Sequence, residues 1–326
     1  MIDLRRVVTG HDEAGNPIVV SDGAPPHSFQ TEDGPGVADI WSLPGPVDSA
    51  TAGFEPEGGF PIEPPPGGMW WRWIRLPLPD QSLPREEQFL DPRFGPGDGP
   101  RGMHATDTLD FALILDGRIE LETETDSTVL GPGDCVVQRG TQHRWRVVGD
   151  GPCTYLVGLI SPEAGAAGSK PLPIRADADE AGVRRVVVSV GDDGRSRIES
   201  DVRLAASVPF AETRGMTDLW NTNGRLARPD QGGDLPGPWQ LEPPDRGVVW
   251  RDLVLPPGRD AASTMIHTTN TIDLLVFLEG TVELLLPGSE PVTLVPGDFV
   301  VQRATAHGWT NVGDGPARMV VIMIGA

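Results

Sequence analysis

His104-Ala-Thr-Asp-Thr-Leu-Asp110, followed by six residues and Gly117, is the stretch around which the chain is organised. It recurs at residues 267–273 as His-Thr-Thr-Asn-Thr-Ile-Asp, again with six residues before a glycine, Gly280. The two copies are 163 residues apart at every matching position. A repeat at this distance indicates two copies of a whole domain rather than a solenoid of short units.

A second motif follows each copy of the first. Residues 133–145 read Gly-Asp-Cys-Val-Val-Gln-Arg-Gly-Thr-Gln-His-Arg-Trp, and residues 297–309 read Gly-Asp-Phe-Val-Val-Gln-Arg-Ala-Thr-Ala-His-Gly-Trp. Outside the motifs, Arg-Arg-Val-Val at residues 5–8 recurs at residues 184–187. The duplication therefore extends over both halves of the chain.

Composition limits the class of protein. The 326 residues carry 47 acidic and 26 basic side chains, a formal net charge of −21, which repels phosphate backbones and excludes nucleic acid as a partner. No apolar run reaches the ~18 residues of a membrane span, and no signal sequence is recognisable. Cys135 and Cys153 lie in apolar, strand-like runs, which is typical of reduced core thiols. We expect a soluble, cytoplasmic protein.

Short alternating apolar runs between abundant glycines (41) and prolines (34) predict an all-β fold. The predicted domains are residues 1–162 and 183–326, joined by a small, polar, proline-containing linker at 163–182. The first half also carries 16 extra residues within 80–102, immediately before its first motif. This insertion is either a tolerated surface loop or a lid over the site.

The motifs resemble those of the cupin superfamily. Its first motif is a glycine, His-x-His, three or four residues, a glutamate, six residues and a glycine; its second is a glycine, five residues, Pro-x-Gly, two residues, a histidine, three residues and an asparagine. Because both halves match, the chain resembles a bicupin, which implies two tandem double-stranded β-helix (jelly-roll) barrels. The matching positions are His104, Asp110, Gly117, Gly133, Gly140 and His143 in the first copy, and His267, Asp273, Gly280, Gly297, His307 and Asn311 in the second.

Both copies depart from the family pattern in the same way. Thr106 and Thr269 replace the second histidine, aspartate replaces the glutamate, and Gln138 and Gln302 replace the proline. Shared departures indicate an inherited variant site rather than decay of one half. The pattern is similar to that of uncharacterised bacterial cupins and of cupins encoded beside fungal polyketide synthases, some of which are called oxidoreductases.

In a cupin the motif residues face the barrel interior. Strand alternation places His143, Trp145 and Val147 on one face, and Asp110 on the same face as Ala112. Since the corresponding wall residues of the second copy are larger, the first barrel is predicted to have the roomier cavity and to be the active one.

The residues His104, Asp110 and His143 admit three interpretations. Two histidines and a carboxylate suit a divalent metal with open coordination positions, such as Fe, Mn, Zn or Ni. The carboxylate could instead orient a histidine in a metal-free acid/base pair. The third interpretation is a buried Asp–His–Thr hydrogen-bond network that fills the barrel and does no chemistry.

Further side chains are candidates for holding a substrate. Thr106, Gln138 and Trp145 are predicted to contact it, although Gln138 could equally stabilise a turn and Trp145 could be a core residue. The second barrel carries equivalent candidates: His267, Asp273 and His307 as catalytic or metal-binding residues, and Thr269, Gln302 and Trp309 as substrate contacts.

Three functions follow. The first is a cupin-type enzyme of aromatic or secondary metabolism, with a divalent metal supporting oxygenation or a related oxidoreductase step. The second is a metal-free isomerase, cyclase or dehydratase, and the third is a non-catalytic ligand-binding bicupin. In each the partner is a small molecule, and the resemblance to bicupins also admits a homodimer.

Overall fold

The computed structural model describes residues 4–32, 34–47, 59–90, 100–169, 172–176, 179–209, 213, 215–258 and 264–326. Within these ranges the chain is built of β-strands, with a single turn of 3-10 helix, η1 (Arg85–Gln88). The predicted all-β fold of two barrels is confirmed. Parts of the insertion and of the linker, at 91–99, 170–171 and 177–178, lie outside the described residues.

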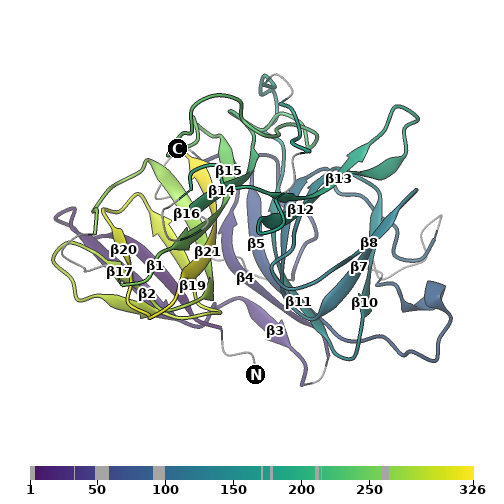
Figure 1. The fold of residues 1–326 in the computed structure, drawn as a ribbon, viewed down its shortest axis with the longest axis horizontal. Helices are drawn as coiled ribbons and strands as arrows, with labels where there is room; N and C mark the ends of the chain where they lie inside the picture. Colours follow the sequence, from purple (N-terminus) through teal and green to yellow (C-terminus); the bar gives the residue numbers. More distant parts are fainter. Residues whose placement is uncertain are drawn as a thin grey trace.

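Each half forms one large and one small sheet (Figure 1). The first half contributes β3 (Ser28–Gln30), β4 (Gly36–Leu43), β5 (Met69–Leu76), β6 (Leu109–Asp116), β7 (Arg118–Thr123), β8 (Ser127–Leu130), β9 (Cys135–Arg139), β10 (His143–Val148) and β11 (Cys153–Ile160). The second half contributes β14 (Gly215–Asn221), β15 (Val248–Leu255), β16 (Thr271–Glu279), β17 (Val282–Leu285), β18 (Val292–Leu294), β19 (Phe299–Arg303), β20 (Gly308–Asn311) and β21 (Ala317–Gly325). Four further strands are exchanged between the halves: β1 (Arg6–His11), β2 (Pro17–Gly23), β12 (Val183–Val190) and β13 (Ser196–Leu204).

The exchange gives each large sheet strands from both halves. The eight-stranded sheet has the order β13-β12-β9-β6-β11-β5-β4-β3, and the seven-stranded sheet has the order β14-β15-β21-β16-β19-β1-β2. The small sheets are β10-β7-β8 and β18-β17-β20. In Figure 1 the purple β1 and β2 accordingly lie among the yellow strands of the second half.

β1 and β12 pair in parallel with strands of the other half, which needs a long connection, whereas β2 and β13 pair antiparallel with β1 and β12. Val7 of β1 is in register with Val300 of β19, and Val186 of β12 with Val136 of β9. The predicted boundaries at 1–162 and 183–326 therefore follow the sequence repeat but not the sheets. Each N-terminal hairpin completes the barrel of the other half, so neither half closes its own sheet.

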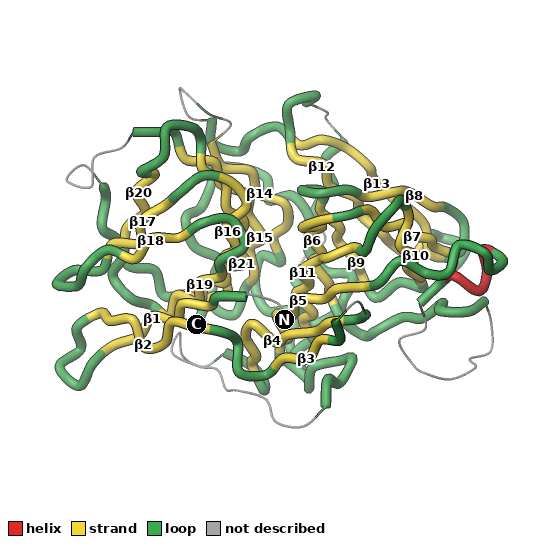
Figure 2. The backbone as a smooth tube through the Cα atoms, turned by 90° about the horizontal axis from the view of Figure 1, so that it is seen from below, coloured by secondary structure: helices red, strands yellow, loops and turns green. Residues whose placement is uncertain are grey.

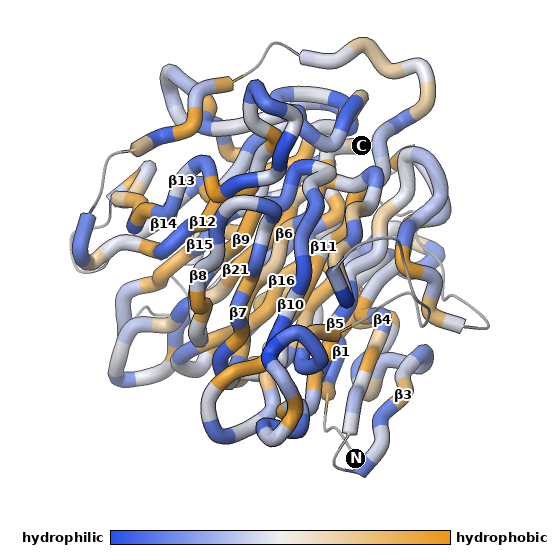
Figure 3. The backbone as a smooth tube through the Cα atoms, turned by 90° about the vertical axis from the view of Figure 1, so that its right-hand side faces the viewer, coloured by the Kyte–Doolittle hydropathy of each residue, from blue (hydrophilic) through white to orange (hydrophobic). Residues whose placement is uncertain are grey.

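A hydrophobic cluster lies between the two large sheets and joins the halves. Phe111 stacks on Trp250 with ring centroids 4.9 Å apart, and Trp71 meets Phe299 edge-on at 5.5 Å. Figure 3 shows hydrophobic residues concentrated along the strands in the middle of the molecule. Two separate apolar clusters fill the barrels themselves. The core between the halves is thus shared, and burial of these aromatic rings is a large favourable term in folding.

Repeated polar residues outside the motifs have a structural role. Arg72 of β5 donates through Nε to Asp39 of β4 at 2.6 Å, and the buried Arg251 of β15 makes the same bond to Asp218 of β14 at 2.5 Å. A buried guanidinium needs a charged partner, because an unpaired buried charge is costly. The same arginine–aspartate pair is thus present at equivalent positions in the two halves of the chain.

Two other expectations concern single features. Cys135 and Cys153 are buried thiols and form no disulfide with each other, which confirms the prediction of core thiols. Burial raises the pKa of Cys153 to about 12, so this thiol is not poised to react. Among the described residues no helix is long and apolar enough to span a membrane.

Candidate active site

His104 and His143 are brought side by side by the backbone. His104 lies ahead of β6 and His143 is the first residue of β10, yet the N–H of each donates to the carbonyl of the other at 3.0 and 2.9 Å. This antiparallel bridge places their ring centroids 4.4 Å apart, with the planes inclined at 53°. Two of the predicted site residues are therefore neighbours in the fold.

Hydrogen bonds set the tautomer of both imidazoles. Nδ1 of His104 lies 2.8 Å from the carbonyl oxygen of Gly102, and Nδ1 of His143 lies 2.9 Å from that of Thr141. A carbonyl oxygen only accepts, so Nδ1 carries the proton and Nε2 carries the lone pair in each neutral ring. Burial, reinforced by the adjacent His104, lowers the pKa of His143 to about 3, so this imidazole is neutral at physiological pH.

The second barrel repeats the pair. The ring centroids of His267 and His307 are also 4.4 Å apart, at 55°, over the same kind of backbone bridge. Nδ1 of His307 lies 2.9 Å from the Thr305 carbonyl oxygen, and burial lowers the pKa of His307 to about 4. The bond from His267 is weaker, because its Nδ1 lies 3.4 Å from the Met265 carbonyl oxygen.

Asp110 lies on the barrel-facing side of β6 and contacts two threonine hydroxyls. Oγ1 of Thr108 is 2.5 Å from Oδ1 of Asp110, and Oγ1 of Thr106 is 3.4 Å from Oδ2. Burial raises the pKa of Asp110 to about 7, against the opposing effect of these hydrogen bonds. The carboxyl group is therefore close to half protonated at neutral pH. In the second barrel burial likewise raises the pKa of Asp273 to about 7.

The predicted metal set is assembled only in part. The two histidines of each barrel meet, whereas the carboxyl of Asp110 is engaged by Thr106 and Thr108. Throughout the described ranges, no group of three or more His, Cys, Asp or Glu side chains is arranged to hold a metal ion. The structure thus places the two histidines of each barrel side by side, and whether they bind a metal stays a prediction.

Gln138 lies beside Asp110 on the neighbouring strand of the sheet. The two residues are in register on β9 and β6, and Gln138 is buried on the face that Val136 shares with the barrel cluster. Its Oε1 accepts a 3.3 Å hydrogen bond from Thr141 in the following turn. Gln138 therefore both lines the barrel and holds the turn that precedes His143. Gln302 faces Asp273 in the same register.

The two tryptophans form part of the barrel walls. Trp145 is half-buried, stacks on Tyr155 at 6.0 Å and 20°, and meets His143 edge-on at 5.9 Å. Trp309 contacts Phe277 at 5.7 Å and His307 at 5.4 Å. Each tryptophan is thus a wall residue beside the histidine pair, as strand alternation predicted.

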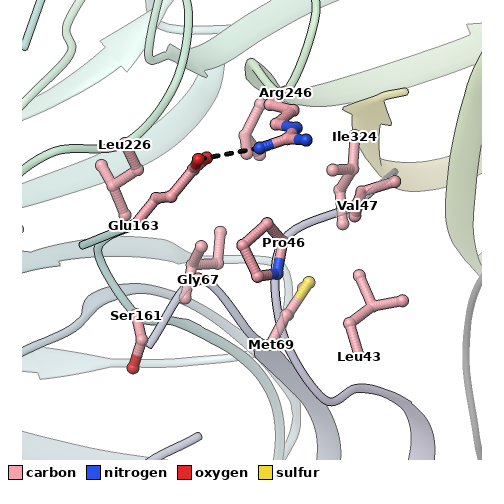
Figure 4. Close-up of a pocket in the computed structure, with 12 residues that line it drawn as sticks. Leu43, Pro46, Val47, Gly67, Met69, Ser161, Glu163, Leu226, Arg246 and Ile324 are labelled. Atoms are coloured by element: carbon pink, nitrogen blue, oxygen red, sulfur yellow. Dashed lines mark hydrogen bonds and ion pairs between the residues drawn. The ribbon is translucent and has the colours of Figure 1, made fainter. Parts of the chain in front are cut away.

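Two hollows differ in their relation to this site. A cavity of about 30 Å³ lies between the halves beside the ion pair of Glu163 and Arg246, 2.8 Å apart (Figure 4). It is large enough for water only. A groove of about 500 Å³ borders the first motif instead, with Asp107 and Gly140 in its wall, a size that suits a small molecule.

Residues 93–158 and 251–323 match the family model described as the cupin domain. The chain contains two cupin domains. These matched segments hold all four site histidines, one pair in each domain.

Known proteins resemble parts of the chain. It is 36% identical over 91 residues to a cupin-domain-containing oxidoreductase of Neurospora crassa, covering 26% of this chain and 45% of that protein. It is 37% identical over 81 residues to a cupin-domain-containing oxidoreductase of Aspergillus ruber, covering 24% and 38%. The chain thus matches less than half the length of these relatives. The crystal structure of AerE from Microcystis aeruginosa aligns over 92% of this chain and 96% of that one, with 9% identity and a TM-score of 0.44.

The exchanged strands bring residues to the cupin sites that the motifs do not reveal. Oγ1 of Thr9, on β1, bonds to Oε1 of Gln302 and lies 2.8 Å from Oγ1 of Thr305 in the second domain. In the first domain the residue beside Gln138 is Val188 of β12. Thr9 and Val188 are 179 residues apart, the same distance that separates the two Arg-Arg-Val-Val segments, so they are equivalent positions. Their contacts with the glutamines could have been predicted only by knowing that the strands exchange.

Four other site residues were not singled out from the sequence: Thr108, Tyr155, Phe89 and Arg144. Thr108 could have been found, because Thr271 occupies the same place in the repeated motif. Tyr155 is the only tyrosine of the chain, but nothing in its strand marks it as a partner of Trp145. Phe89 lies in the insertion, which has no counterpart in the second half.

Proposed function

We propose that the chain is an oxidoreductase of small-molecule metabolism whose reaction takes place at His104 and His143 in the first cupin domain. One observation carries the proposal: adjacent imidazoles, each with Nδ1 bound to a backbone carbonyl. Imidazoles that bind metals donate their other ring N–H in this way, and they bind as the neutral form. His143 meets both conditions at neutral pH.

The donor set fits a divalent ion in part. His104 and His143 are borderline ligands that suit Fe, Mn, Zn or Ni, and they would hold the ion through Nε2. Asp110 does not join them, so the remaining coordination positions would be open to water and substrate. When bound, such an ion supplies Lewis-acid or redox chemistry at an open position.

Asp110 is suited to move a proton within the first barrel. With a pKa raised to about 7, its carboxyl group can both accept and donate a proton at neutral pH. Thr108 and Thr106 orient this carboxyl group, and Gln138 lies opposite with an amide able to bind a carbonyl or hydroxyl group.

The wall of the first domain favours a flat, largely apolar substrate. Trp145 and Tyr155 present stacked rings beside His143, and Ala112 belongs to the apolar cluster of the barrel. Aromatic rings of this kind stack with planar ligands.

The relatives named as oxidoreductases support the reaction class. We further propose a cytoplasmic location, in keeping with two buried cysteines that remain thiols, and a small molecule rather than nucleic acid as partner, in keeping with the net charge of −21. A homodimer is proposed from the resemblance alone, and light scattering would test it.

A second function is favoured by the raised pKa of Asp110. A carboxyl group with a pKa near 7 is also what a metal-free isomerase, cyclase or dehydratase needs as a proton donor or acceptor. In that case Asp110 and His143 exchange protons with the substrate directly. A non-catalytic ligand-binding protein is the third candidate, and it requires neither a metal nor turnover.

Elemental analysis of protein purified without chelator and without a histidine tag tests the proposal. We expect near-stoichiometric Fe, Mn, Zn or Ni that disappears in a variant carrying His104→Ala and His267→Ala. If no metal is present even after reconstitution, the metal-dependent function is wrong, and the acid/base function is tested next through the Asp110→Asn variant.

A further inference from the structure

Arg144 follows His143 on β10 and points away from the barrel. It is buried, and its guanidinium carbon lies 3.7 Å from the ring centroid of Phe89. Its Nε donates to Glu122 at 2.7 Å and one of its terminal nitrogens donates to Glu86 at 2.7 Å. Glu86 and Phe89 belong to the insertion, so Arg144 attaches the insertion to the strand that carries His143. Figure 2 shows the short helix η1 beside β10 and β7 at the edge of the molecule.

The same contacts extend to the far end of the insertion. Arg144 also donates to the carbonyl oxygen of Arg101 at 3.4 Å, and Arg101 donates through Nε to that of Phe89 at 3.1 Å. The N–H of Leu90 bonds to the carbonyl oxygen of Trp145 at 3.0 Å. Segments 85–90 and 100–104 are therefore held against each other and against β10.

This arrangement fixes the carbonyl group that orients His104. Gly102, which follows Arg101, accepts the Nδ1–H of His104. It has a positive φ of 75°, and a Cβ there would lie 2.1 Å from the carbonyl oxygen of Leu90. Only glycine fits so close an approach. The position of the Gly102 carbonyl thus depends on the contact between segments that Arg144 holds together.

The described residues of the second domain hold no counterpart of Arg144 or of the insertion, although a backbone carbonyl still faces His267. Gly308 occupies the place of Arg144, and a Cβ there would lie 2.7 Å from Cγ2 of Thr264 and 2.9 Å from Cδ1 of Ile266. Met265 and Ile266 are 71% and 44% exposed. In this domain the distance from Nδ1 of His267 to its carbonyl partner is 3.4 Å, against 2.8 Å for His104.

We infer that Arg144 is a positioning residue for His104, acting through Phe89, Arg101 and the Gly102 carbonyl, and that this support distinguishes the first histidine pair from the second. The inference rests on the proposed function for its consequence, since an oriented His104 matters only if the ring binds a metal or substrate. Residues that orient metal-binding histidines typically contribute about 10–100-fold to metal affinity.

The matched control is Arg146, two residues along the same face of β10. It bonds to Glu120 and Gln88 and lies 5.7 Å from the Phe89 ring centroid. No bond joins it to Arg101 in the described hydrogen-bond network. A merely structural attachment of the insertion would be weakened by loss of either arginine, whereas positioning of His104 depends on Arg144.

The test compares wild type, Arg144→Ala, Arg144→Lys and Arg146→Ala by NMR of the metal-free protein labelled with ¹⁵N-histidine, with the His104 signal assigned from a His104→Ala spectrum. We expect solvent exchange of the His104 Nδ1–H to accelerate about 10-fold or more in Arg144→Ala, less in Arg144→Lys, and not in Arg146→Ala. Titration with Co²⁺ should show a dissociation constant raised about 10-fold in Arg144→Ala alone.

The outcomes separate the two proposals. If wild type binds no Co²⁺ but Nδ1–H exchange accelerates in Arg144→Ala, the positioning role stands and the metal-dependent function falls. If exchange is unchanged in folded Arg144→Ala, or equally faster in Arg146→Ala, the positioning role is wrong. Should Arg144→Ala fail to fold, Arg144→Lys decides by the same measurement, because it keeps the charge but loses the planar fork of donors.

Discussion

The two cupin domains carry the same histidine pair but support it differently. In the first, Arg144 and the insertion hold the backbone around His104, and the Asp110 carboxyl group is bonded to threonines. In the second, Gly308 replaces the arginine, and the described structure gives no hydrogen-bond partner to Oδ1 of Asp273 or Nε2 of Gln302, both buried. Duplication has preserved the geometry of the rings, while the residues that orient them have diverged. Under the proposed function, this difference makes the first domain the one in which we expect the reaction.

The largest expected effect comes from removing one histidine from each domain. His143→Ala should weaken metal binding by at least about 100-fold, because one of only two protein ligands is lost, whereas His307→Ala should leave the tight site unchanged. Isothermal titration with Co²⁺ measures both, with circular dichroism as a check on folding. Equal losses in the two variants would show that the domains are equivalent.

The two domains cannot be compared as separate units in the hydrophobic core, because residues of both halves build it. Phe111→Ala removes the ring that stacks on Trp250 and should lower the free energy of unfolding by about 3–5 kcal/mol. β1 completes the large sheet of the second half, and β12 completes that of the first half. Calorimetry should therefore show a single unfolding transition, and the variant should shift its midpoint to lower temperature. Two transitions, with only one of them shifted, would mean that the halves unfold separately.

The buried carboxyl groups predict a shared pH dependence and a difference between the domains. Burial raises the pKa of Asp110 and Asp273 from 3.8 to about 7, so the folded state binds more protons than the unfolded state between these values. Each group therefore contributes stability that is present below pH 4 and is lost as the pH rises through about 7.

Replacing either aspartate by asparagine removes this ionisation. Asp273→Asn should increase stability at pH 8 by about 1–3 kcal/mol, because a buried charge with an unpartnered oxygen is removed. Asp110→Asn should give less, since both oxygens of its carboxylate accept threonine hydrogen bonds, whereas Oδ1 of Asp273 has no partner among the described residues. Urea unfolding at pH 5 and pH 8 measures the free energy of unfolding of both variants. A larger increase at pH 8 from Asp110→Asn than from Asp273→Asn would show that the Asp110 carboxylate is the more destabilising of the two.

The smallest effect concerns the exchanged strands. Thr9→Val introduces the residue type found at the equivalent position 188 and removes the hydroxyl that bonds to Gln302 and Thr305. The expected loss is about 1 kcal/mol of unfolding free energy, typical of one hydrogen bond. Val188→Thr is the reciprocal variant. If Thr9→Val is neutral, the second domain does not depend on the exchanged hydroxyl.

The sequence predicted the fold class and the grouping of the motif histidines because these depend on local patterns. Alternation and repeated glycines marked the strands, and the spacing of His104 and His143 marked one site. The strand exchange was not predictable, because pairing of β1 with β9 or with β19 uses the same residue types, and only the packing of both halves decides between them.

Arg144 escaped prediction for a different reason. Strand alternation places an arginine next to a motif histidine on the outer face of the barrel, where a residue is usually exposed to solvent. Arg144 is buried only because the insertion covers it. Its signal was present in the comparison of the halves: the arginine replaces Gly308 in the half that also has the extra 16 residues. When one half of a duplicated chain has both an extra charged residue and an insertion, a contact between the two is a reasonable prediction.

A crystal structure of protein soaked in Co²⁺, with anomalous data at the metal edge, tests the central claim most directly. The proposed function predicts a strong anomalous peak about 2.0–2.2 Å from Nε2 of both His104 and His143, with a weaker peak or none at His267 and His307. No peak at His104 and His143 in crystals that contain the metal would contradict it. Equal peaks at both pairs would retain metal binding but overturn the distinction between the two domains.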